Sequence, residues 1–188
     1  MDWTIPGTVL RGDRQKAEEI ESQFTAMFLG GDLVLSQVSA ITGLETYHIQ
    51  NWVKRGFLTP PQKKHYSLTQ LCRILNINML KNVLNLEDIC RLLQYVNGSL
   101  DDASDDMIDD SVLYFMFVKL AARVKELYDP DQREALLEEV LQDYQEPVPG
   151  AAERVKEVLR IMLTAWLAAR MVQESRRMLY ETTYNKEN

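Results

Sequence analysis

The chain has 188 residues, of which 46% are hydrophobic and 26% are charged, a balance typical of a globular protein with a sizeable core. Its net charge of −7 is unusual for a nucleic-acid-binding protein, because contact with phosphates relies on Lys and Arg. The longest apolar run near the C-terminus, residues 158–172, is interrupted by two arginines and is too short to span a bilayer. The N-terminus lacks the basic start and apolar core of a signal peptide. We therefore expect a cytoplasmic protein without a membrane partner, in which Cys72 and Cys90 are buried, reduced thiols.

Residues 1–32 predict an irregular arm and one helix. Trp3, Pro6 and Gly7 interrupt any regular pattern in the first thirteen residues. Apolar residues then recur at three- and four-residue steps over residues 14–29, which predicts an amphipathic helix that ends at a pair of glycines.

The segment Leu35–Leu58 predicts two helices joined by a tight turn. Ser36 is a plausible N-cap for the first helix, and Gly43 supplies the backbone freedom that the turn needs. The second helix, Thr46–Lys54, has one apolar face and one face of hydrogen-bonding and cationic side chains. Such a face suits the major groove of DNA.

A β-hairpin, or wing, is expected next. Pro60 and Pro61 forbid a helix after the second helix, and two lysines at the tip of the hairpin are suited to phosphate contact. Ser67 can cap a third helix, and a fourth begins near Leu86 and ends near Val96. We place one domain at residues 33–97, followed by a linker at residues 98–110 that contains six aspartates.

Residues 111–188 are helical in pattern throughout. Ser111–Tyr128 is too apolar for a surface helix, Pro130 starts another helix, and residues 151 to about 184 form one helix roughly 50 Å long at 1.5 Å per residue. Apolar residues at alternating four- and three-residue steps on that helix predict a partner helix. The large apolar side chains of this domain are expected to pack in a core or dimer interface in preference to an effector pocket. The candidate effector or dimer surface is Tyr114, Phe115, Phe117, Met162 and Trp166.

The charge of the chain is unevenly distributed. Residues 33–97 hold seven basic residues against three acidic ones, a net charge of +4, whereas residues 98–188 hold eleven basic against nineteen acidic, a net charge of −8. The acidity therefore lies outside the segment that carries the predicted DNA-reading helix, and an acidic C-terminal half would repel DNA and keep its orientation unique.

Residues 33–97 resemble the winged helix-turn-helix of MerR-type regulators. In that family a helix-turn-helix is followed by a Gly-Leu-Leu strand, a short wing that ends in Tyr-Ser, and a helix pair that ends in a Leu-Glu-Glu-Ile-like segment. The matching segments here are Val34-Leu35-Ser36 through Gly43, Ile49 to Trp52, Gly56-Phe57-Leu58, Tyr66-Ser67 and Leu86-Glu87-Asp88-Ile89. As a whole, the chain also resembles a bacterial family of uncharacterised proteins, classed as a domain of unknown function, that carries such a module ahead of a helical tail.

The chain departs from the MerR pattern at its expected DNA anchors. Family members commonly have Arg-x-Tyr where Gln50, Asn51 and Trp52 stand, and an arginine in the wing where Lys64 and His65 stand. Gln50 can still read adenine or bond a phosphate. No Cys or His follows Gly98, which excludes a thiolate or imidazole metal sensor in that region. The residues expected to contact DNA are Thr46, Tyr47, His48, Gln50, Asn51, Lys54, Arg55, Lys63, Lys64, His65 and Tyr66.

These observations predict a mainly α protein with an N-terminal winged helix-turn-helix that has a small β-hairpin wing. An extra helix precedes this module, and an all-helical dimerisation or effector domain follows it. The expected function is transcriptional regulation through double-stranded DNA, as a homodimer. Two alternatives are a protein-interaction module whose winged-helix fold does not bind DNA, and a sensor of a small apolar ligand. A phosphate-binding glycine loop, a nucleophile elbow and a His paired with Ser or Cys are all missing, so we expect neither an enzyme nor a cofactor.

Overall fold

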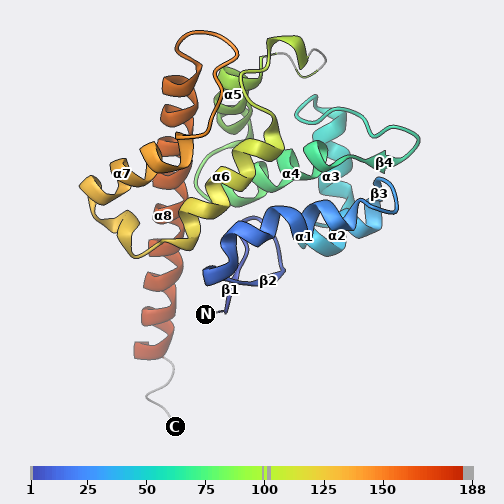
Figure 1. Ribbon diagram of the computed structural model, residues 1–188. Coiled ribbons are helices and arrows are strands. Elements are labelled where there is room, and N and C mark those ends of the chain that lie inside the picture. The colour runs from blue at the N-terminus through green and yellow to red at the C-terminus, as the bar shows by residue number, and fades with distance from the viewer. Residues whose placement is uncertain (1, 99, 101–102, 184–188) are drawn as a thin grey trace.

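The computed structural model describes residues 2–98, 100 and 103–183, and it is mainly helical (Figure 1). Two small antiparallel sheets accompany the helices, one pairing β1 with β2 and the other pairing β3 with β4. The strands are β1 (Asp2–Thr4), β2 (Arg11–Asp13), β3 (Leu33–Val34) and β4 (His65–Tyr66). The α-helices are α1 (Ile20–Met27), α2 (Leu35–Thr42), α3 (Thr46–Lys54), α4 (Leu68–Leu80), α5 (Leu86–Asn97), α6 (Asp110–Ala122), α7 (Pro130–Leu141) and α8 (Ala151–Thr183). The prediction of a mainly α protein is confirmed.

Helix α4 is the centre of the core. It begins with the expected cap, because the Ser67 hydroxyl accepts from the Gln70 backbone N–H while the Gln70 side chain accepts from the Ser67 N–H. Nine of its thirteen residues are buried, since α2, α5, α6 and α8 all pack around it. The core therefore continues from residues 33–97 into residues 111–183. The linker predicted at 98–110 marks a change in composition, whereas packing joins the segments on either side of it.

The N-terminal arm is a β-hairpin, so the prediction of an irregular arm is wrong. Trp3 pairs with Gly12 in the register of β1 and β2, and the side chains of Trp3 and Ile5 are buried. These strands have three residues each and depend on the core beneath them. The single helix expected over residues 14–29 is also divided into a 3₁₀ helix, Arg14–Glu19, and α1, and Lys16 leaves helical geometry inside the 3₁₀ helix. Helix α2 begins at Leu35, with Val34 rather than Ser36 at its N-cap.

The predicted effector or dimer surface is not a surface. Each of its five side chains is at most 8% exposed, and they lie inside the core of one chain. The rings of Phe117 and Trp166 meet edge to face at 5.8 Å and join α6 to α8, while the Tyr114 hydroxyl donates to the Pro6 carbonyl at 2.8 Å. Helix α6 is also shorter than the predicted Ser111–Tyr128 helix, since the chain leaves helical geometry at Arg123.

Helix α8 divides into two parts. Its first half packs in the core, whereas residues 171–183 are all exposed and extend beyond the other helices (Figure 1). The exposed part carries large apolar side chains at Met171, Val172, Met178 and Leu179. None of the helices in the described part of the chain combines the length and apolar composition that a bilayer crossing requires.

Candidate nucleic-acid interface

Helix α3 is held in a fixed direction by the turn that precedes it. Gly43 adopts a φ of 70°, in the left-handed region that favours glycine. The Ser39 hydroxyl donates to the Leu44 carbonyl at 2.6 Å, and the Leu44 N–H donates to the Thr42 hydroxyl at 3.2 Å. These bonds explain why small polar residues precede the turn. Ile49 and Trp52 then fix the inner face of α3, because both side chains are buried.

The outer face of α3 is free for a partner. Tyr47 is 61% exposed, and its ring lies 4.0 Å from the half-buried His48 ring, centroid to centroid. Within the described residues, no hydrogen bond or ion pair engages the side chains on this face. The predicted contacts that lie on it are Thr46, Tyr47, His48, Gln50, Asn51 and Lys54.

The wing, residues 59–67, contains a tight turn with two lysines at its centre. The His65 N–H donates to the Gln62 carbonyl at 2.9 Å, and Lys63 and Lys64 have φ values of 49° and 69°. Two successive left-handed residues define the mirror-image turn that hairpins favour, usually with Asn-Gly at these positions. Lysine is strained there, and strain of this kind clusters at functional sites.

Helix α3 and the wing meet at one groove. Gln50 from α3 and Lys64 from the wing both line a cavity of about 610 Å³, whose walls also include residues at the start of α2. The pairing of Leu33 with Tyr66 fixes the base of the wing beside α2. Tyr66 differs from the other predicted contacts, because its ring is 2% exposed and burial raises the pKa of its hydroxyl. It supports the groove from the core and offers no ring face to a partner.

Arg55 lies at the end of α3 but is directed toward α5. Its guanidinium bonds the Glu87 carboxylate and lies 4.5 Å from the centre of the Phe57 ring. This ion pair offsets the charge of Arg55. Lys54, Lys63 and Lys64 are therefore the cations of the predicted set that no described carboxylate pairs with.

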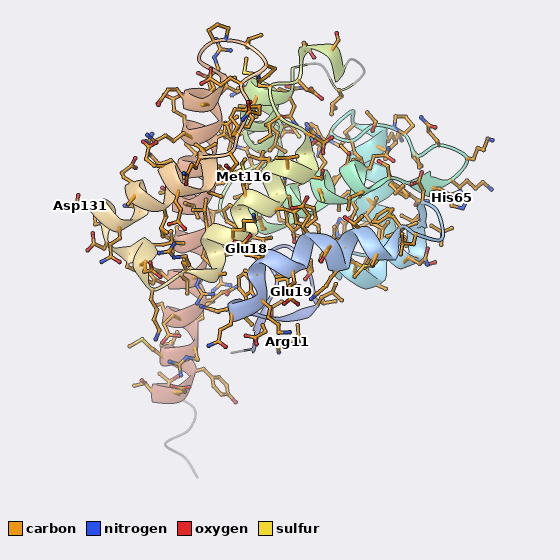
Figure 2. The ribbon with its side chains drawn as sticks, viewed as in Figure 1. Arg11, Glu18, Glu19, His65, Met116 and Asp131 are labelled. Atoms are coloured by element: carbon orange, nitrogen blue, oxygen red, sulfur yellow. The ribbon has the colours of Figure 1, made fainter. Side chains whose placement is uncertain are left out.

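The acidic residues of the C-terminal half lie at different places relative to the groove. Figure 2 shows His65 at the outer edge of the wing and Asp131, in α7, at the opposite end. Asp109, by contrast, lies nearer to the wing, because it accepts a hydrogen bond from the Thr69 hydroxyl at 2.9 Å and lines a cavity together with Thr59. A polyanion that approached the wing would meet lysines there and repulsion at α7.

One family covers most of these elements. The domain of unknown function DUF1836 matches residues 23–117, half of the chain. The chain belongs to this family. The chain is also similar to the uncharacterized protein YkrK of Bacillus subtilis (strain 168), with 25% identity over 142 residues, which are 73% of this chain and 58% of that protein. The chain thus spans less than two thirds of the length of this relative. No solved structure matches the chain significantly.

The DUF1836 region runs from α1 to the middle of α6, so it includes α3, the wing and a buried ion pair that sequence reasoning missed. Arg73 of α4 and Asp110 of α6 lie 3.1 Å apart, with side chains 3% and 7% exposed. Arg73 is one of the seven basic residues of the predicted DNA-binding segment. Because it is buried and paired, it contributes to the packing of the DUF1836 region and cannot reach DNA.

Acidic residues crowd the start of α6 beside this pair. Burial and the charges of Asp110, Asp105 and Asp109 raise the pKa of Asp106 to about 6. A carboxyl group whose pKa is higher in the folded state stabilises the fold fully below its unfolded pKa, near 4, and loses that contribution as pH rises through 6.

We expect the melting temperature to rise as pH falls from 7.5 to 5.0. Asp106→Asn should flatten this dependence and stabilise the protein at pH 7.5 by about 1 kcal/mol, after allowance for solvent screening. Thermal melts over this pH range measure the effect. Asp143→Asn, at an exposed position outside the acidic crowd, is the control and should keep the wild-type profile. An unchanged profile in Asp106→Asn would assign the pH dependence to another group.

Proposed function

We propose that the protein is a DNA-binding transcriptional regulator and that residues 33–97 act as a MerR-like winged helix-turn-helix. The observation that carries the proposal is the groove shared by Gln50 and Lys64. It means that the exposed face of α3 and the strained lysine turn point to the same side of the molecule. Helix α3 would enter the major groove while the wing lysines contact phosphates.

The apolar residues at the end of α8 support a homodimer as part of this proposal. Val172 and Leu179 are 49% and 61% exposed and lie seven residues apart on the part of α8 that extends from the body. A seven-residue spacing places them on one seam of a coiled coil. Pairing of two α8 helices would present two copies of α3 to one DNA duplex. A clean monomer at micromolar concentration in sedimentation would contradict this pairing.

A salt titration tests DNA binding. Binding to a random duplex, measured by fluorescence anisotropy, should weaken steeply with salt, with a slope of about −2.7 per protomer in log K against log salt if three lysines contact phosphates. Lys54→Gln should reduce the magnitude of that slope by about 0.9, because it removes one phosphate contact.

Lys125→Gln is the matched control, since Lys125 is an exposed lysine outside α3 and the wing. It should leave the slope unchanged. Undetectable binding at low salt, or equal slopes for Lys54→Gln and the wild type, would reject the DNA proposal and favour a protein-interaction module.

A further inference from the structure

A second cleft lies away from the groove, among three segments that are distant in sequence. It measures about 520 Å³ and is walled by the loop after β1, the end of α4 and the middle of α8. Gly7 forms part of the loop wall at a φ of 75°, where a Cβ atom would lie 2.5 Å from the Leu75 carbonyl oxygen. The close approach of this loop to α4 therefore requires glycine.

The charged side chains that line this cleft are all cations. They are Lys81, the C-cap residue of α4, and Arg170 of α8, and no carboxylate lines the walls. The Arg170 Nε is buried without a hydrogen-bond partner, and its guanidinium lies 5.0 Å from the centre of the Trp166 ring. Glu174, one turn further along α8, bonds Arg177, and its pKa is lowered mainly by that bond and also by the charge of Arg170. Within the described residues, neither Lys81 nor Arg170 forms an ion pair.

A third cation, Arg14, lies close enough to Arg170 for the two charges to repel each other. Burial and the charge of Arg170 lower the pKa of Arg14, whose Nε is also buried without a partner. Like charges held close together destabilise a fold, and a bound anion reduces that cost. Arginine and lysine are the side chains that most often hold phosphate and carboxylate oxygens.

The neutral side chains of the cleft can complete such a site. Asn78 is already used, because its amide donates to the carbonyls of Gly7 and Thr42. Thr4, Asn82 and Gln173 also line the cleft, and their side chains bond no other residue in the described part of the chain. They leave donors and acceptors for the hydroxyl or carbonyl groups of a small polar molecule.

We propose that this cleft binds a small metabolite that carries a phosphate or carboxylate group, with the oxyanion held by Arg170 and Lys81. The cleft is joined to the candidate nucleic-acid interface. The Asn78 amide donates to Thr42 at the end of α2, and Val9, next to the cleft wall, donates its N–H to the Ile41 carbonyl at 3.0 Å. Occupancy of the cleft therefore biases the turn that orients α3. This second step rests on the proposed DNA-binding function, whereas ligand binding does not.

Thermal melts of the protein without DNA test the site. Inorganic phosphate, glucose 6-phosphate and citrate are the probes, and glucose and sodium chloride at equal ionic strength are the controls. At ten times its dissociation constant, a bound probe should raise the melting temperature by about 3 to 6 °C. Glucose 6-phosphate and inorganic phosphate together identify a phosphate site, whereas protection by citrate alone identifies a carboxylate site.

Variants separate this site from general salt effects. Arg170→Gln and Lys81→Gln should each abolish the rise, and Arg170→Gln without ligand should melt no lower than the wild type, because its repulsion of Arg14 is lost. Arg176→Gln, an exposed position on the same helix, should retain the full rise. Equal shifts in Arg170→Gln and Arg176→Gln, or no shift with any probe, would overturn the site.

DNA affinity measured with and without the protecting probe tests the coupling, with an expected change of about 5-fold or more. Protection without any change in DNA affinity would overturn the coupling and leave the site standing. Protection of a protein that binds no DNA would reject the proposed function alone.

Discussion

Replacing Arg73 with methionine should lower the free energy of unfolding by about 3 to 5 kcal/mol, because it leaves the Asp110 carboxylate buried without its counter-charge. Arg73 and Asp110 are among the few charged side chains inside the core. The Arg73 Nε also donates to the Phe57 carbonyl at 3.1 Å, and the Asn76 amide donates to the Asp110 carbonyl at 3.3 Å. The pair thus joins the segment after α3 to α4 and α6.

Urea denaturation measures the loss, and pH supplies a second signature. Burial raises the pKa of Asp110 while Arg73 opposes that rise, so removal of the guanidinium should raise the pKa further. The destabilisation should then shrink at low pH, where Asp110 is protonated. Arg73→Met combined with Asp110→Leu should recover most of the loss, because the buried charge is gone.

A surface pair provides the control. Arg91 and Asp88 lie 3.2 Å apart with side chains 80% and 50% exposed, so Arg91→Met should cost less than about 0.5 kcal/mol. If Arg73→Met were as mild as Arg91→Met, the buried pair would contribute little to the fold.

Arg73 also shows where sequence reasoning stops. The sequence predicted the features that depend on neighbouring residues alone. These are the turn at Gly43, the N-cap at Ser67 and the start of α7 at Pro130. Nothing in the neighbourhood of Arg73 distinguishes it from a surface arginine, because its burial follows from α6, about 37 residues away, packing on α4. The same holds for β1 and β2, whose three-residue strands depend on the core beneath them.

The candidate sites also divide into those that one segment forms, which could be predicted, and those that distant segments form together, which could not. The outer face of α3 could be predicted because a single helix contributes all of its side chains. The two lysines at the tip of the wing could be predicted because they lie in a single turn. The cleft lined by Lys81 and Arg170 could not be predicted, since the two residues are 89 positions apart in the sequence. Neither residue differs from a surface cation in its local sequence. The pairing of Arg55 with Glu87 likewise depends on where α5 lies relative to α3.

Replacing Lys63 with asparagine and Lys64 with glycine should change stability and DNA affinity in opposite directions. Asn-Gly is the preferred pair for the turn that these residues form, and a non-glycine residue in the left-handed region costs about 1 to 2 kcal/mol. Glycine also raises the conformational entropy of the unfolded chain, which offsets part of the gain in the free energy of unfolding. We therefore expect a net stabilisation of about 1 kcal/mol, measured by urea denaturation.

The same double substitution removes two cations from the wing. If both contact phosphate, each supplies about 0.9 log units of affinity at 0.1 M salt relative to 1 M, so DNA binding should weaken by about 10- to 60-fold. Anisotropy at two salt concentrations measures the loss. A variant that is more stable than the wild type cannot owe its weaker binding to unfolding, so this result would assign the strained lysines to function.

Lys63→Ala with Lys64→Ala separates charge from backbone strain. Alanine removes both charges but remains strained at a positive φ, so this variant should lose the same affinity without the gain in stability. Full DNA affinity in the Asn-Gly variant would remove the wing from the proposed interface. A gain in stability in the alanine variant would instead trace the cost to repulsion between the two lysines, and the turn would then need no functional explanation for its strain.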